Sequence, residues 1–133
     1  MRKFIIISLC ALAVLGCKKN DSAGYLDFEN VVVTGDYSEL TSTHVKLSAS
    51  FSPLYYMDVE EVGVIISTSN SVLDLSHYTY YRNSYDVGPE YTCEFSYLSP
   101  GTTYYYRAFM RYDYLFSYKT EYGDIKTFTT LPQ

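Results

Sequence analysis

Tryptophan is absent from the 133 residues, and cysteine, histidine and basic side chains are scarce. The chain has three Cys, two His, and 10 Lys and Arg against 15 Asp and Glu, which gives a formal net charge of −5 at pH 7. A chain with this acidic balance lacks the cationic surface that attracts phosphate backbones. We therefore expect no nucleic-acid partner.

The scarcity of reactive side chains argues against catalysis. Neither His44 nor His77 lies near a Ser or Cys in a nucleophile motif. No group of His, Cys, Asp and Glu has metal-ligand spacing, and Gly-rich phosphate loops are missing. We expect a protein that is not an enzyme, with no catalytic residue, no metal and no cofactor.

The longest apolar run, residues 4–15, is too short to cross a membrane, because a spanning helix needs about 20 residues. Two basic residues precede the run, and Gly16 and Cys17 follow it. A basic start, an apolar centre and a small residue at the end are typical of a secretion signal. The sequence therefore predicts a signal peptide over residues 1–16.

A small residue followed by Cys17 resembles the lipobox of bacterial lipoproteins. The resemblance implies that Cys17 becomes a lipidated N-terminus, held in a membrane by acyl chains, and that residues 17–24 form a polar tether. Lys18 after this cysteine resembles lipoproteins sent to the outer membrane. We expect a lipid-anchored outer-membrane protein whose domain, residues 25–133, lies on the cell surface or faces the periplasm. An ordinary signal peptide with an incidental Cys17 is the alternative.

Roughly 110 residues beyond the tether are enough for one domain whose core needs no disulfide. Cys10 leaves with the signal and Cys17 carries the lipid, so the mature chain is expected to form no intramolecular disulfide. Cys93 lies in an alternating apolar pattern. We expect it to be a small buried hydrophobic residue.

Alternating apolar residues predict short β-strands in the domain. The clearest strand spans residues 44–51, with an inward side made of Val45, Leu47, Ala49 and Phe51. Residues 62–66 form a continuous apolar run, which is typical of a central strand covered on both faces. Gly35 and Asp36 predict a turn. No stretch has a helical period, and about seven short strands separated by turns predict an all-β sandwich.

One turn and the strand after it carry a more specific pattern, made of Leu98, Pro100, Gly101, Thr102 and Tyr104, followed by alternating Tyr106, Ala108 and Met110. This pattern resembles the corner between strands E and F of fibronectin type III domains, and the wider sequence resembles the fibronectin-like domains of Bacteroidetes surface lipoproteins. The resemblance implies a seven-stranded immunoglobulin-like sandwich with Tyr104 at the structural tyrosine-corner position. Since the chain has no Trp, Phe51, Phe95 or a Tyr must fill the volume of the core Trp found in many members.

Aromatic residues provide the candidate binding site. The densest cluster contains the four candidate ligand-binding residues, Tyr112, Tyr114, Phe116 and Tyr118. In the implied sandwich they lie on the loop between strands F and G, where exposed rings contact protein partners or stack on sugars. Alternatively, they continue the even-numbered positions of the preceding strand and pack on a long hairpin.

These features together predict a non-catalytic cell-envelope lipoprotein. Its sandwich would be a surface binding or adhesion module for a protein or a glycan, attached to the membrane through its lipid anchor. The alternative is a periplasm-facing structural or accessory subunit of an outer-membrane complex.

Overall fold

The computed structural model describes residues 31–54, 57–71, 73–83 and 87–133, and within these ranges all regular structure is β-strand. The strands are β1 (Val32–Ser38), β2 (Val45–Phe51), β3 (Asp58–Ser67), β4 (Tyr78–Asn83), β5 (Glu90–Phe95), β6 (Thr103–Tyr114), β7 (Ser117–Tyr122) and β8 (Lys126–Thr129). No helix in the described ranges is long and apolar enough to cross a membrane. The predicted signal peptide, Cys17 and the tether lie outside the described residues.

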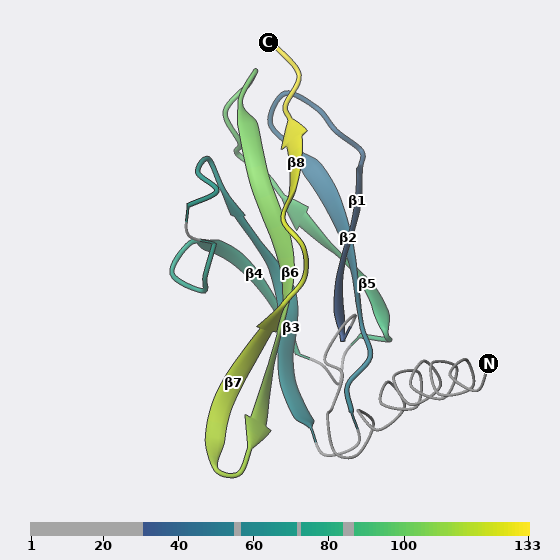
Figure 1. Ribbon diagram of the computed structural model, residues 1–133. Coiled ribbons are helices and arrows are strands. Elements are labelled where there is room, and N and C mark those ends of the chain that lie inside the picture. Colours follow the sequence, from purple (N-terminus) through teal and green to yellow (C-terminus); the bar gives the residue numbers. More distant parts are fainter. Residues whose placement is uncertain (1–30, 55–56, 72, 84–86) are drawn as a thin grey trace, which may run out of the picture.

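The strands form two packed sheets (Figure 1). One sheet has the order β1-β2-β5, and the other has the order β4-β3-β6-β7, with β8 also paired to β6. β8 pairs with the first residues of β6 and β7 with the last, so β7 and β8 share one strand position. The described strands therefore occupy the seven positions of a fibronectin type III-like sandwich, as the sequence predicted.

β2 shows why the alternating pattern places the core between the sheets. Val45, Leu47 and Ala49 are buried, whereas Lys46 and Ser48 between them are partly exposed. Side chains at alternate positions of a strand point to opposite faces, so the apolar set faces the second sheet. The strand predicted here is confirmed.

Aromatic residues fill the core of this Trp-free chain. Phe95 and Tyr106 are almost completely buried, while Phe51 is only partly buried. The hydroxyl of Tyr106 donates to the Gly35 carbonyl oxygen at 2.9 Å, and that of Tyr91 donates to the Gly63 carbonyl oxygen at the same distance. Burial raises the pKa of Tyr106 to about 12, so its hydroxyl remains a hydrogen-bond donor at neutral pH.

Gly35 and Asp36 do not form the turn that we expected. They lie inside β1, where the pairing with β2 shifts in register between Thr34 and Tyr37. A Cβ on Gly35 would lie 2.7 Å from the Ser48 carbonyl oxygen. The glycine is therefore required by the close approach of two strands at a bulge.

A second apolar cluster covers the opposite face of the five-stranded sheet. Ile65 of β3 and Phe109 of β6 are fully buried there beneath Leu73, which belongs to the segment between β3 and β4. β3 is consequently covered on both faces, as its continuous apolar run predicted. The segment that carries Leu73 is part of the packed structure.

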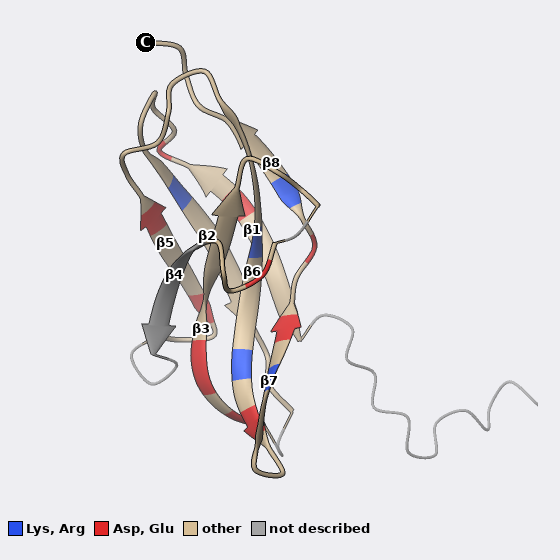
Figure 2. Cartoon of the chain, turned by 90° about the vertical axis from the view of Figure 1, so that its left-hand side faces the viewer, with Lys and Arg blue, Asp and Glu red and all other residues tan. Residues whose placement is uncertain are grey.

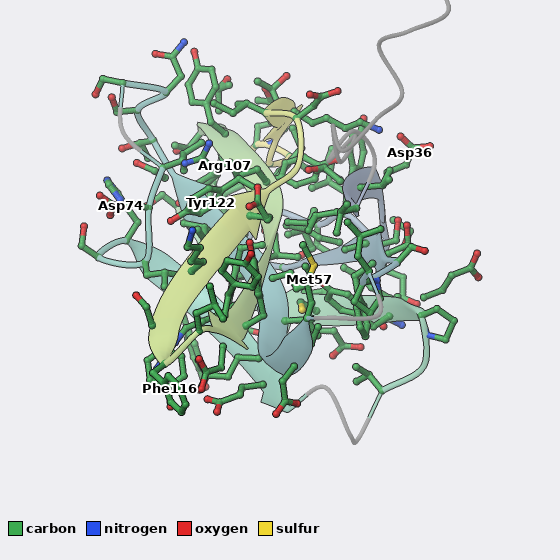
Figure 3. All side chains as sticks on the ribbon, turned by 60° about the horizontal axis from the view of Figure 1, so that its bottom comes forward. Asp36, Met57, Asp74, Arg107, Phe116 and Tyr122 are labelled. Carbon is green, nitrogen blue, oxygen red and sulfur yellow. The ribbon has the colours of Figure 1, made fainter. Side chains whose placement is uncertain are left out.

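Arg107 ties this cluster to the sheet (Figure 3). Its guanidinium lies 3.9 Å from the centre of the Tyr122 ring and donates to the Leu73 carbonyl oxygen. Burial lowers the pKa of Arg107 from its ordinary value. The aromatic ring and the carbonyl oxygen stabilise the cation in this partly buried position.

β1 packs against the sheet at the short segment between β7 and β8. The Gly123 N–H donates to the Ala108 carbonyl oxygen at 2.9 Å, and the Ala108 N–H donates to Thr34 Oγ1 at 3.0 Å. A Thr side chain of one sheet thus satisfies a backbone donor of the other. A Cβ on Gly123 would lie 2.5 Å from Thr34 Oγ1 and 2.8 Å from the Thr34 nitrogen.

We expect Gly123→Ala to lower the free energy of unfolding by about 1–3 kcal/mol, because the new methyl group must displace the backbone of β1. Gly88→Ala is the matched control, since a Cβ there has no atom within 4 Å. Urea-induced unfolding of both variants measures the difference. Equal stabilities would show that β1 does not approach Gly123 this closely.

Candidate functional site

The aromatic segment that we placed on a loop is a continuous hairpin of β6 and β7. Antiparallel pairing runs without interruption from Phe109 and Tyr122 to Tyr114 and Ser117. The loop prediction is therefore wrong, and the alternative of a long hairpin is confirmed. Only Leu115 and Phe116 connect the two strands.

The two connecting residues have an unusual backbone conformation. Leu115 has φ 52° and Phe116 has φ 64°, so both central residues of the turn are in the left-handed region. Two-residue hairpin turns with this geometry normally use Asn-Gly or Asp-Gly, because a large side chain at positive φ is strained. The left-handed conformation costs about 1–2 kcal/mol for each residue that has a Cβ.

The fold gains little from these two side chains. Leu115 is 76% exposed and Phe116 is fully exposed, and Phe116 lies at the outer end of the hairpin (Figure 3). We call these two residues the hairpin tip. Two large apolar side chains thus occupy strained positions while contributing little to the core.

The structure separates the four candidate ligand-binding residues. Tyr112 is only 3% exposed and belongs to the main core, and its hydroxyl donates to Glu121 Oε1 at 3.1 Å. Its assignment as a ligand contact is corrected, because its ring offers no surface to a partner. Tyr114 is partly buried against the same core, with Lys119 Nζ 5.0 Å from the centre of its ring.

Tyr118 lies on the opposite face of the hairpin from Tyr112. The two-residue turn pairs Tyr118 with Asp113, and cross-strand partners share a face. The even-numbered positions suggested that all four residues lie on one side of the hairpin. The two-residue turn instead places Tyr118 on the other side. Tyr118 is 57% exposed.

Electrostatic contacts hold Tyr118 in place. The Arg111 guanidinium lies 4.5 Å from the centre of its ring, and the Tyr118 hydroxyl donates to Glu60 Oε1 at 3.3 Å. Arg111 Nη1 also donates to Glu61 Oε2 at 3.1 Å. The ring is consequently fixed beside the hairpin tip.

Carboxylates surround the base of the hairpin tip. Asp58 of β3 and Asp113 of β6 are direct cross-strand partners, and Asp113 Oδ1 is buried with no hydrogen-bond partner among the described residues. Figure 2 shows acidic positions on β3 and β6 at this end, beside a basic position of β6. Like charges at paired positions are destabilising, so this end of the sheet is not optimised for stability.

Tyr104 lies far from this tip, at the beginning of β6. Its ring stacks on Phe128 with centroids 5.4 Å apart, and the Ser99 N–H donates to its hydroxyl oxygen at 3.0 Å. The adjacent turn includes Gly101 at φ 59°. Tyr104 thus links the turn before β6, through its hydroxyl, to the core, through its ring.

We expect Tyr104→Phe to destabilise the domain by about 1–3 kcal/mol, because the Ser99 N–H loses its acceptor. Thermal unfolding followed by circular dichroism measures the change. Tyr97→Phe is the control, since Tyr97 is 99% exposed. An unchanged melting temperature for Tyr104→Phe would mean that water replaces the hydroxyl without loss.

In the part of the chain that the structure describes, no three His, Cys, Asp or Glu residues gather in an arrangement that could hold a metal ion. His77 Nδ1 lies 3.3 Å from Asp74 Oδ1, and His44 Nδ1 lies 3.2 Å from Ser96 Oγ. These are local contacts in different parts of the domain. The sequence places Leu115 in the same aromatic stretch as Phe116, but Leu115 was not among the four candidate contacts, because its position in a turn is not visible from the pattern.

Comparison with known proteins shows the fold. No protein-family model matches the chain, and no curated protein matches it. The sensor domain of the anti-sigma factor RsgI4 from Pseudobacteroides cellulosolvens is similar, with a TM-score of 0.53 and 16% identity over 77% of this chain and 94% of that one. The sixth fibronectin type III domain of human fibronectin type III domain containing protein 3 gives a TM-score of 0.54 and 18% identity, over 76% of this chain and 84% of that one. The chain is a fibronectin type III-like β-sandwich.

Proposed function

We propose that this protein is a non-catalytic binding module of the cell envelope, lipid-anchored to the outer membrane through Cys17, and that its hairpin tip contacts a partner. The observation that carries the proposal is that two adjacent large apolar residues, Leu115 and Phe116, are both strained and exposed in one two-residue turn, whereas Tyr97 has these properties only as a single residue. A fold keeps residues in an unfavourable conformation only when something else is gained. Similarity to fibronectin type III and sensor domains supports a binding or sensing role rather than catalysis.

The shape of the tip favours a protein over a glycan as the partner. Leu115 and Phe116 form a convex projection at the end of a hairpin, which fits into an apolar pocket. A sugar platform needs several open aromatic faces, and at this tip only Phe116 is fully exposed, because the Arg111 guanidinium lies over the ring of Tyr118. The tip therefore resembles the central residues of a protein interface, with Tyr118 at its rim.

In-cell formaldehyde cross-linking of the tagged full-length chain tests this function. We expect one cross-linked species for the wild type, and its yield should fall by about 30-fold in the Leu115→Ser/Phe116→Ser variant, because losing two buried contacts removes at least about 2 kcal/mol. Tyr97→Ser, at an exposed site elsewhere, is the control and should keep the yield. A species that survives in the tip variant would place the binding site elsewhere.

The membrane anchor is tested separately. Cys17→Ala removes the only site for the proposed acyl chains, and we expect the variant to leave the membrane fraction or to remain unprocessed. Fractionation of cells and the apparent mass of the product measure both outcomes. A variant of mature size in the membrane fraction would contradict lipid anchoring at Cys17.

A further inference from the structure

The hairpin tip lies at the end of the sandwich where the described chain begins. β1 starts at Val32, which pairs with Phe51, the last residue of β2. Residues 52–57 join β2 to Asp58, and Asp58 pairs with Asp113, one residue before the end of β6. The start of β1 and the tip therefore share one pole, as Figure 1 shows.

The chain ends at the opposite pole. β8 pairs with the first residues of β6, and the C-terminus lies beyond β8, away from the β6–β7 hairpin (Figure 1). Leu131 there donates its N–H to the Thr41 carbonyl oxygen at 3.1 Å. Tyr97, which is almost completely exposed, belongs to the same pole, because the Leu98 N–H next to it donates to the Thr43 carbonyl oxygen.

A lipid at Cys17 would hold the tip pole close to the membrane. About 14 peptide units separate Cys17 from Val31, which limits the reach of this segment to about 50 Å. The described domain begins at Val31, at the pole of the tip, so a lipid at Cys17 would hold that pole nearer the bilayer. The tip is thus presented to the anchoring membrane, and the Tyr97 pole is presented away from it.

We propose that the tip binds, in cis, an integral protein of the same membrane that presents an apolar pocket with a basic rim. This inference rests on the proposed function of the tip and names its partner. Lipid anchoring confines both proteins to one surface, so the effective concentration is in the millimolar range and a contact of two side chains is sufficient. A partner in solution would have to approach the pole that faces the bilayer.

The charges near the tip favour a protein over the bilayer itself. Segments that insert at a membrane surface place cations around their apolar residues. Here four carboxylates, Asp58, Glu60, Glu61 and Asp113, lie on the rungs below the tip. They outnumber the two cations there, since Arg111 is paired with Glu61 and Lys119 lies over the ring of Tyr114. Carboxylates are disfavoured at the level of the headgroups and acyl chains, but they complement basic residues at the rim of a protein pocket.

Site-specific photo-cross-linking in cells tests the partner. Phe116→p-benzoylphenylalanine places the reactive group at the tip, and Tyr97→p-benzoylphenylalanine is the matched control, because both side chains are fully exposed and both residues have positive φ. The full-length, anchored chain carries each substitution. Adducts are separated by mass and assigned to the membrane or soluble fraction, and lipid adducts are detected by mass spectrometry.

We expect the tip position to give one adduct with an integral membrane protein, at a yield at least about tenfold above position 97, and to lose it in the Cys17→Ala background. An adduct with lipid, or with a soluble or extracellular protein, would overturn the cis inference while leaving the tip as a contact element. No adduct at position 116 above the control would overturn both proposals.

Discussion

The Leu115→Asn/Phe116→Gly variant is expected to be more stable than the wild type by about 1–3 kcal/mol. Both residues have positive φ, which Asn tolerates better than Leu and which Gly adopts without strain. Part of this gain in stability is lost, because Gly raises the entropy of the unfolded chain and so lowers the free energy of unfolding by about 0.5–1 kcal/mol. The midpoint of urea-induced unfolding measures the net effect.

Leu115→Ser/Phe116→Ser is the matched control for this prediction. Ser retains a Cβ at both positions, so the turn remains strained, and the exposed apolar side chains that are lost contribute little to the core. We expect its stability to stay within about 0.5 kcal/mol of the wild type. If the Asn-Gly variant is no more stable than the Ser-Ser control, the turn is not strained.

Phe109→Ala is expected to destabilise the domain by about 3–5 kcal/mol, which is a large part of the stability of a domain of this size. Phe109 is fully buried in one cluster with Ile65 and Leu73, on the face of the sheet away from the main core. Removing the ring leaves a cavity that the rigid sheet cannot close. Urea-induced unfolding again measures the change.

Phe116→Ala provides the control, because the same chemical change at a fully exposed site removes no packing. Its free energy of unfolding should be nearly that of the wild type. If Phe109→Ala loses less than about 1 kcal/mol, the segment that carries Leu73 does not seal this face of the sheet.

The strands were predictable from the sequence where burial alone decides the pattern. β2 alternates because one face meets the core, and residues 62–66 of β3 are continuously apolar because both faces are covered there. The turn before β6 was predictable because Pro100 has a fixed φ that suits a turn and Gly101 adopts positive φ without strain. In these places the local chemistry and the tertiary packing require the same structure.

The errors arose where tertiary contacts override local preferences. Gly35 was expected to turn the chain, yet it is needed because Ser48 of the next strand approaches it closely. The hairpin was predicted only as an alternative to a loop, because Leu115 and Phe116 lack the usual Asn-Gly or Asp-Gly signal of a two-residue turn. Once that turn is placed, pairing of Tyr114 with Ser117 moves Tyr118 to the other face.

The candidate site was only partly predictable, because tertiary packing also decides which aromatic residues are exposed. A sequence pattern does not distinguish an exposed aromatic residue from a buried one. Tyr112, which lies in the core, and Phe116, which lies in solvent, therefore appeared equivalent. Their difference depends on how far the hairpin extends beyond the opposite sheet. That distance is a property of the assembled sandwich, not of the hairpin sequence.

The most direct test of the account is the in-cell cross-linking yield of the Leu115→Asn/Phe116→Gly variant, made at the same level as the wild type. The account predicts a yield about 30-fold lower, although the variant is the more stable protein, because its turn has lost the two side chains that enter the partner. A yield equal to that of the wild type would contradict the central claim that the strained tip exists for binding.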